Sequence, residues 1–396
     1  MSYNFDTLID RRNTRSYKWD QVGPLFGHAD ILPLWVADMD FPSPPAVQEV
    51  LKKRAALGAY GYAIRTDSYL EAIQGWYERR HGWSIDKEWI LDSPSVVTSL
   101  SLAVEQFTSP GDAVVLQSPV YYPFYDVIRG NDRVVARNPL VLRNGRYEMD
   151  LEQLESLFKD GAKLMLLCSP HNPGGRVWER DELLRLGELC LRYGVTVVSD
   201  EIHCDLVFPD KQHVPFAALS PEIADITITC LAATKTFNLP GLHTSFIVVS
   251  NEGMRQRLDK RMKTLSLHMA QHFAQDAVEA AFNEGGEWLD AMLAYVKDNL
   301  DYALSYLSEH LPQVKPMVPD GTYLLWVDCR GLGLDRSGLK DLMFNKAKVA
   351  FNDGTIFGTE GEGWLRINLA CPRSILKQAL KQFGEAAQRE FEAGRA

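Results

Sequence analysis

Between about residues 90 and 250, short runs of consecutive apolar residues alternate with segments of helical periodicity. The runs are DAVVLQSP (112–119), KLMLLCSP (163–170), VTVVSDE (195–201), ITITCLAA (226–233) and SFIVVS (245–250). They do not alternate apolar with polar residues, so we expect strands of a parallel sheet that helices cover on both faces. Residues 181–194, DELLRLGELCLRYG, predict one such helix, ending at Gly194. The pattern predicts an α/β core.

The two ends of the chain predict a second, smaller α+β domain. FPSPP at 41–45 cannot lie inside a helix and separates an amino-terminal arm from the core. Residues 287–312 predict a long amphipathic helix, followed by the strands GTYLLWVD and WLRINLA and a final helix. We therefore predict an arm and part of the small domain in 1–45, a large cofactor-binding domain in 46–286 and a carboxyl-terminal small domain in 287–396, with a ligand cleft between the domains.

Composition excludes several classes of function. The 396 residues carry a formal net charge of −10, which argues against a nucleic-acid partner. The six cysteines lie too far apart for a zinc site or a redox pair, so we predict reduced thiols and no metal site. Because the amino terminus lacks a signal-peptide pattern and no apolar run reaches the ~20 residues that span a bilayer, we expect a soluble, cytoplasmic protein without a membrane partner.

Polar side chains that directly follow the predicted strands are the candidate site residues, because ligands bind outside the carboxyl ends of parallel strands. These residues are Tyr121, Asn172, Asp200 and Lys235. Lys235 lies between two apolar strands, a setting that lowers the pKa of an amine and suits a Schiff-base lysine; a solvated loop lysine is the alternative. Asp200 either caps a following helix or pairs with the pyridine nitrogen of a pyridoxal cofactor.

Four ordered motifs resemble fold-type I aminotransferases, the superfamily with the aspartate aminotransferase fold. They are SPHNPGG (169–175), SDEIH (199–203), TKTFNLPGL (234–242) and RINLACPRS (366–374). Within that superfamily the chain is similar to the MalY/PatB group of cystathionine β-lyases, through PLWVADMDF (33–41), YGY (60–62) and SDEIHCDL. The resemblance runs nearly end to end and implies the cofactor pyridoxal 5'-phosphate.

The resemblance also implies a role for each strand-end residue. Lys235 is expected to bind the cofactor covalently and to move the Cα proton, while Asp200 pairs with the pyridine nitrogen. Asn172 is expected to bind the ring hydroxyl, and Tyr121 to stack on the ring, with core packing as its alternative. Arg366 is expected to bind the substrate α-carboxylate, since a planar guanidinium matches a carboxylate; a surface ion pair is the alternative.

The phosphate is expected at a helix start, where Ser95, Val96 and Val97 offer backbone amides to an anion. A helix start that is simply buried is the alternative. The resemblance places the Thr234 hydroxyl beside the phosphate as well. It also implies that Tyr62 reaches the phosphate of a neighbouring subunit, so a homodimer is expected.

Two positions depart from the aminotransferase pattern. Ala232 and His243 stand where a serine and an arginine commonly bind the phosphate, so the helix amides, Tyr62 and a protonated His243 would carry more of the cofactor's affinity. His203 stands near the expected ring hydroxyl; it and His243 have packed, structural roles as alternatives. Trp35 and Ala37 are expected to border the substrate pocket, with core packing as the alternative for Trp35. Loops such as 351–363 are expected to set the size of the pocket.

The resemblance implies β-elimination from sulfur amino acids. L-cystathionine would give homocysteine, pyruvate and ammonia, and other cysteine S-conjugates are further candidate substrates. An aminotransferase shares the early steps of this reaction, so residue types do not separate the two. A regulatory or interaction protein that holds the cofactor with little turnover is the alternative from another class, which Ala232 and His243 leave open.

Overall fold

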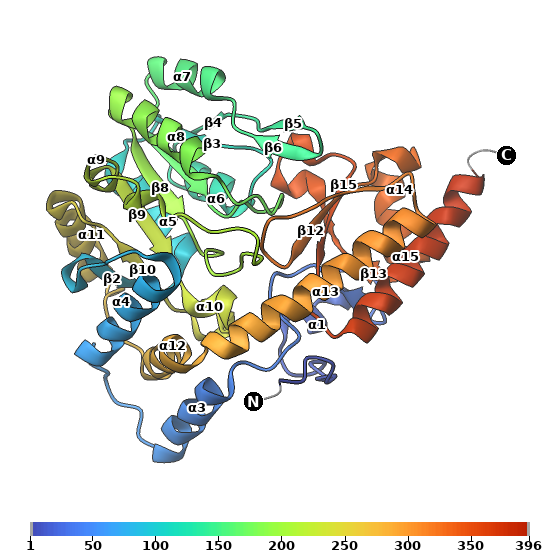
Figure 1. Cartoon of the computed structure of the whole chain (residues 1–396), viewed down its shortest axis with the longest axis horizontal. Coiled ribbons are helices and arrows are strands. Elements are labelled where there is room, and N and C mark those ends of the chain that lie inside the picture. The colour runs from blue at the N-terminus through green and yellow to red at the C-terminus, as the bar shows by residue number, and fades with distance from the viewer. Residues whose placement is uncertain (1–2, 394–396) are drawn as a thin grey trace.

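The five apolar runs form strands of one seven-stranded sheet (Figure 1). The computed structural model describes residues 3–393. The strands lie in the order β2 (Ile90–Ser93), β10 (Ser245–Val248), β9 (Thr227–Leu231), β8 (Thr196–Asp200), β7 (Leu164–Cys168), β3 (Ala113–Leu116) and β4 (Val134–Arg137). β3, β7, β8 and β9 are parallel, as predicted, and β4, which was not predicted, is parallel to β3.

The parallel direction predicted for 245–250 is wrong. β10 runs antiparallel to both β9 and β2. The connection from β9 to β10 contains only the four-residue helix α10 (Ala233–Thr236) and a short 3₁₀ turn at Pro240–Leu242. A parallel neighbour needs a crossover, usually through a full helix, so this short connection returns the chain in the opposite direction.

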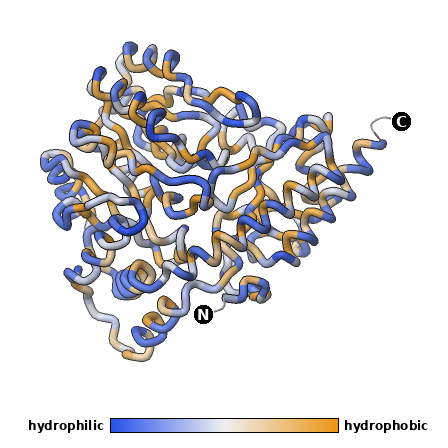
Figure 2. Tube along the Cα trace, in the orientation of Figure 1, coloured by the Kyte–Doolittle hydropathy of each residue, from blue (hydrophilic) through white to orange (hydrophobic). Residues whose placement is uncertain are grey.

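Alternate residues of the central strands pack against helices on opposite faces of the sheet. On β7, Leu164 and Leu166 share a core with α5 (Val96–Phe107), α6 (Pro123–Gly130) and α11 (Glu252–Thr264). Met165 and Leu167 share a core with α7 (Leu151–Lys159), α8 (Arg180–Tyr193) and α9 (Pro221–Asp225). Figure 2 shows the hydrophobic segments concentrated in the interior strands, while the outer helices alternate hydrophobic and hydrophilic residues. The continuous apolar runs therefore reflect burial on both faces.

The helices follow the predicted pattern. The helix predicted at 181–194 is α8, and Gly194 caps it with φ 65°. The helices on or beside the large sheet are α3 (Pro45–Leu57), α4 (Asp67–His81), α5 (Val96–Phe107), α6 (Pro123–Gly130), α7 (Leu151–Lys159), α8 (Arg180–Tyr193), α9 (Pro221–Asp225), α11 (Glu252–Thr264) and α12 (His272–Glu284). None of the helices within residues 3–393 is long and apolar enough to cross a membrane.

The two ends of the chain meet around a second, antiparallel sheet. Its strand order is β11 (Lys315–Met317), β12 (Leu324–Asp328), β15 (Trp364–Asn368) and β14 (Asn352–Asp353). The predicted long helix is α13 (Gly286–His310), which packs against the final helix α15 (Arg373–Ala393) (Figure 1). Near the amino terminus, β1 (Leu32–Pro33) pairs with β13 (Val349–Ala350). This pairing supports grouping both chain ends; the boundaries at residues 45 and 286 stay a prediction.

The remaining α-helices and strands are short. They are α1 (Tyr17–Asp20), α2 (Val22–Phe26), α14 (Arg336–Asp341), β5 (Val141–Arg143) and β6 (Arg146–Glu148). α1 and α2 lie close in sequence to β1, and α1 carries a lysine whose side chain is fully buried. This amino-terminal region therefore contributes to the interior of the molecule.

Candidate functional site

The predicted site residues meet at the carboxyl ends of β3, β7, β8 and β9. The chain leaves β3 for β4 on one side and later enters β7 on the other, so β3 and β7 flank the point where strand order reverses. The residues that follow these two strands touch, since the Tyr121 N–H donates to the Asn172 carbonyl at 3.1 Å. A cavity of about 410 Å³ opens here, a volume typical of small-molecule sites.

Thirteen of the fourteen predicted residues border this cavity. They are Trp35, Ala37, Ser95, Val96, Val97, Tyr121, Asn172, Asp200, His203, Thr234, Lys235, His243 and Arg366. The fourteenth residue, Tyr62, does not border the cavity, and 93% of its surface is exposed. Its exposure is compatible with the predicted contact to a neighbouring subunit.

Lys235 extends from α10 into the cavity. Its Nζ donates to the Ala37 carbonyl at 2.5 Å. Burial lowers the pKa of the amine to about 8, against a smaller opposing effect of the Asp38 carboxylate. About half of the amine is therefore neutral at pH 8, and the neutral amine is the form that attacks a carbonyl carbon or accepts a proton.

Asp200 ends β8 and is buried. A turn rather than a helix follows it, so Asp200 is not a helix cap; its Oδ1 accepts the Ile202 N–H at 3.2 Å. Burial raises the pKa of this carboxyl to about 7. A carboxylate desolvated in this way gains from a cation placed against it, and a protonated pyridine nitrogen is such a cation.

Replacing Asp200 with asparagine is expected to change how stability depends on pH after the cofactor is removed. The pKa of Asp200 rises from 3.8 in the unfolded chain to about 7 in the folded protein. The protonated carboxyl therefore leaves the folded protein at its full stability below the unfolded pKa, and this stability is lost as the pH rises through the folded pKa. Between about pH 4 and pH 8 the wild type should lose up to about 4 kcal/mol of unfolding free energy that the variant retains. Urea denaturation at both pH values measures this difference, and identical pH dependence of the two proteins would contradict it.

Arg366 projects from β15 into the same cavity. Nη1 donates to the Asn172 side chain at 2.9 Å, and Nη2 to the Trp35 carbonyl at 3.0 Å and the Asn352 side chain at 2.6 Å. All three acceptors are neutral, and burial lowers the pKa of the guanidinium to about 10. Only 3% of Arg366 is exposed, which excludes the surface ion pair. A buried cation bound to neutral oxygens is suited to a carboxylate ligand.

The amino terminus of α5 forms another wall of the cavity. Ser95 caps the helix, its Oγ accepting the Thr98 N–H at 3.1 Å. The first N–H groups of a helix have no partner within it, and the helix dipole favours an anion there. Ser95, Val96 and Val97 border the cavity together with Thr234, so this wall suits a phosphate.

The two departures differ in position. Ala232 is buried at the start of α10, and it is not among the residues that border the cavity. His243 is exposed, borders the cavity and has φ 49°, in the left-handed region. His203 is buried at the cavity wall, and burial lowers its pKa to about 3, so the imidazole there is neutral.

Several cavity residues were not predicted. They are Tyr17, Val36, Pro94, Tyr122, Cys168, Ile202, Pro240, Thr244, Asn352 and Ile356. Asn352 and Ile356 belong to the 351–363 segment that was expected to set the size of the pocket. That expectation was the sequence signal that could have identified them. Tyr17 lies in α1 and meets Trp35 with ring centroids 5.2 Å apart. No motif marks Tyr17, because its place depends on contacts distant in sequence.

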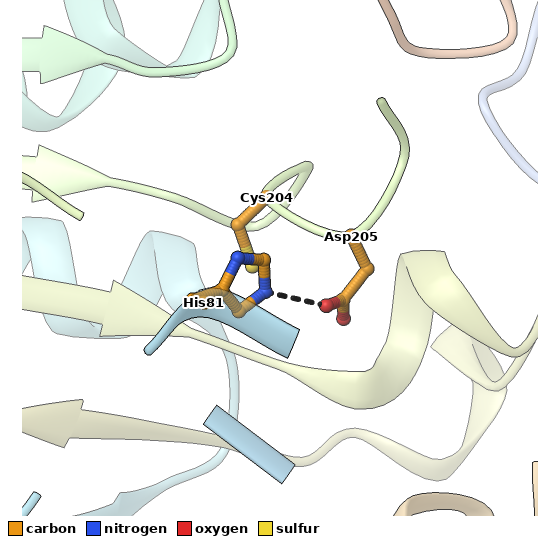
Figure 3. A group of neighbouring side chains, drawn as sticks. All are labelled: His81, Cys204 and Asp205. Atoms are coloured by element: carbon orange, nitrogen blue, oxygen red, sulfur yellow. Dashed lines mark hydrogen bonds and ion pairs between the residues drawn. The ribbon is translucent and has the colours of Figure 1, made fainter. Parts of the chain in front are cut away.

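A polar side-chain cluster lies outside the residues that border the cavity (Figure 3). His81, Cys204 and Asp205 lie close enough to share a metal ion. However, Asp205 Oδ1 already accepts from His81 at 2.8 Å and from Trp76 at 3.0 Å, and Oδ2 accepts from Thr236 at 2.8 Å. Burial also raises the pKa of the Cys204 thiol, which disfavours a thiolate ligand. These bonds instead anchor Thr236, the residue next to Lys235.

The residues of the cavity fit pyridoxal phosphate. An amine of lowered pKa, a buried carboxylate and a helix amino terminus match the aldehyde carbon, the ring nitrogen and the phosphate of that molecule. Arg366 is a further cation at the same cavity.

Comparisons with known proteins agree with this geometry. Cystathionine beta-lyase PatB of Bacillus subtilis is 46% identical over 384 residues, which cover 97% of this chain and 99% of the relative. Protein MalY of Escherichia coli is 36% identical over 96% of this chain and 97% of its own length. A PLP-bound putative aminotransferase from Clostridium difficile superposes with a TM-score of 0.96 at 44% identity, covering 98% of this chain and all of that one.

These likenesses confirm the predicted aspartate aminotransferase-like fold and the resemblance to the MalY/PatB group. The model of the family "aminotransferase class I and II" matches residues 29–383. The chain therefore belongs to the aminotransferase class I and II family.

Proposed function

We propose that this protein is a pyridoxal-phosphate-dependent carbon–sulfur lyase that cleaves L-cystathionine to homocysteine, pyruvate and ammonia. The observation that carries the proposal is that one cavity contains both the Lys235 amine of lowered pKa and the buried Arg366 guanidinium. The near end-to-end similarity to a relative named cystathionine beta-lyase supports the choice of reaction. Other cysteine S-conjugates are further candidate substrates.

The chain supplies a partner for each part of the cofactor. Lys235 would hold it covalently, and Asp200 would lie opposite the pyridine nitrogen. Asn172 would bind the ring hydroxyl and Tyr121 would stack on the ring. The phosphate would bind the amides at Ser95, Val96 and Val97 and the hydroxyl of Thr234.

When bound, pyridoxal phosphate supplies a conjugated electron sink for the charge that develops at the substrate Cα. Arg366 binds the α-carboxylate through its planar fork and so orients the Cα–H bond toward Lys235. Lys235 removes the Cα proton, and the bond between Cβ and sulfur then breaks. The sulfur leaves as the thiol of homocysteine, and one water molecule converts the remaining three-carbon fragment to pyruvate and ammonia.

The test is to incubate the purified protein with L-cystathionine and to assay pyruvate and homocysteine while the near-ultraviolet and visible spectrum is recorded. Equal amounts of both products would support the lyase. A spectral change to the amine form of the cofactor with L-alanine, reversed by a keto acid and without pyruvate from cystathionine, would favour the aminotransferase. A bound cofactor that supports neither reaction would contradict both the lyase and the aminotransferase hypotheses and would favour a regulatory protein that holds the cofactor.

We also propose a homodimer in which Tyr62 reaches the neighbouring site. Tyr60, Tyr62 and Ile64 expose 61%, 93% and 77% of their surfaces, and large apolar side chains exposed in one segment suit an interface. The segment joining α3 to α4 carries all three residues.

Replacing Tyr62 with phenylalanine is expected to weaken cofactor binding roughly 10- to 100-fold, the effect of losing one hydrogen bond to a charged group. Spectral titration of the cofactor-depleted dimer measures the dissociation constant. Tyr60→Phe is the matched control, since its hydroxyl donates to Ala55 within the same chain at 2.8 Å. Unchanged affinity in Tyr62→Phe would contradict the shared site.

We further propose that the protein acts in the cytoplasm. Its six cysteines are all buried free thiols, a state that a reducing compartment maintains. Cell fractionation followed by detection of the protein tests this location, and recovery mainly from the secreted fraction would contradict it.

A further inference from the structure

Residues 35–41, the crossing segment, present backbone carbonyls to both cations of the site. The Ala37 carbonyl accepts the Lys235 Nζ at 2.5 Å and the Tyr323 hydroxyl at 3.1 Å. The Trp35 carbonyl accepts Arg366 Nη2 at 3.0 Å. The conformation of this segment therefore sets where the lysine amine and the guanidinium lie relative to each other.

Buried and partly buried ion pairs hold the crossing segment from the amino-terminal side. Arg11 binds both oxygens of Asp38, at 3.0 and 2.7 Å, and also Asp40 at 2.8 Å. Lys18, whose side chain is fully buried, binds Asp40 at 2.7 Å. Breaking a buried pair by removing one partner is strongly destabilising, so this arrangement fixes the segment firmly.

Two asparagines, Asn238 and Asn368, hold the segment through bonds to its backbone. Asn238 lies two residues after α10, the helix that carries Lys235. Its side-chain Oδ1 accepts the Met39 N–H at 3.0 Å, and its Nδ2 donates to the Met39 and Phe41 carbonyls at 3.0 and 2.8 Å. Asn368 on β15 donates to the Val36 and Asp38 carbonyls at 2.7 and 2.6 Å. The Ala37 carbonyl is thus fixed relative to the β9–β10 connection, which carries Lys235, and to β15, which carries Arg366.

We propose that the Ala37 carbonyl and the Tyr323 hydroxyl form the docking point that holds the Lys235 amine once the substrate has displaced it, and that Tyr323 is a positioning residue for proton transfer at Cα. This inference rests on the proposed function. A lysine amine on a flexible four-carbon stem needs a fixed acceptor to act as an oriented base. A neutral amine that donates one N–H to Ala37 keeps its lone pair for the Cα proton.

The charges around Lys235 suit this role. The proton taken from Cα converts the amine to an ammonium, which bonds more strongly to the Ala37 carbonyl than the neutral amine does. The Asp38 and Asp200 carboxylates favour the ammonium, whereas Arg366 and burial disfavour it. His203 is neutral, and burial raises the pKa of Tyr323, so its hydroxyl remains a donor.

Tyr323 offers a small test change, because Tyr323→Phe removes one oxygen from a side chain that is 1% exposed. Tyr147→Phe is the matched control, because Tyr147 is also buried, with 3% of its surface exposed. Its hydroxyl accepts the Trp326 Nε1–H at 3.1 Å, and neither residue borders the cavity. Both variants are studied as holoenzymes.

The first measurement is exchange of the Cα hydrogen of L-alanine with D₂O, followed by NMR, which reports proton transfer without elimination. Tyr323→Phe should slow exchange at saturating alanine roughly 3- to 10-fold, the effect of one hydrogen bond, with little change in KM. The second is the pH titration of the cofactor's absorption bands, whose midpoint should move in Tyr323→Phe and stay unchanged in Tyr147→Phe.

Wild-type exchange rates and an unshifted titration in Tyr323→Phe would overturn the docking point, as would equal effects in the control. Failure of the proposed lyase is a separate result, because exchange with alanine and the spectral titration need no leaving group. A wild type that exchanges the alanine hydrogen but forms no pyruvate would reject the lyase while the comparison of Tyr323→Phe with Tyr147→Phe still decides the docking point.

Discussion

Replacing Lys235 with alanine is expected to reduce pyruvate formation from L-cystathionine by at least about 10³-fold, because one side chain supplies both the covalent attachment and the base. Burial holds the pKa of this amine near 8, and its Nζ has a fixed acceptor at Ala37. Both properties match a group that alternates between bond formation and proton transfer. Steady-state kinetics with saturating cofactor measure the loss.

The absorption spectrum of Lys235→Ala should also differ from that of the wild type, since the cofactor would bind without its covalent link. Lys163→Ala is the matched control, because Lys163 is exposed and pairs with Asp112 at 3.2 Å. Its activity should stay within about twofold of wild type, as expected for a surface ion pair. Near-normal turnover by Lys235→Ala would place the base elsewhere in the cavity.

Residues that directly follow strands were predictable, because the local pattern contains the information needed to place them. The apolar runs end at Asp200 and just before Asn172 and Lys235, and adjacent parallel strands bring their carboxyl ends to one edge. Burial of Asp200, with its raised pKa, follows from a strand covered on both faces. The resemblance then supplied the chemistry for positions that the pattern had located.

Residues that reach the cavity through long-range contacts were not predictable from the sequence pattern. Tyr17 lies there because its neighbour Lys18 is drawn into a buried pair with Asp40, 22 residues away. Asn352 faces Arg366 because β14 and β15 pair in a particular register. The antiparallel direction of β10 follows from the short connection between β9 and β10, and the apolar runs do not indicate the direction of a strand. Such features arise from pairing and packing, so no local signal carries them.

Replacing Arg366 with alanine is expected to lower kcat/KM for L-cystathionine by roughly 30- to 3000-fold, which corresponds to about 2–5 kcal/mol for a buried charge pair that loses one partner. Arg366→Lys should recover only part of this loss, because a point charge lacks the planar fork that binds both carboxylate oxygens. Arg330→Ala is the control, since Arg330 is exposed and pairs with Asp328 on the same sheet.

Binding of L-alanine and of L-alaninamide separates the carboxylate contact from other effects. The wild type should prefer the carboxylate, and Arg366→Ala should lose that preference; a retained preference would assign the carboxylate to another group. The lowered pKa of about 10 indicates that Arg366 is kept charged at an energetic cost. Arg366→Met removes this cost but leaves three buried oxygens without their donor, so its urea midpoint should stay near that of the wild type while its activity is lost.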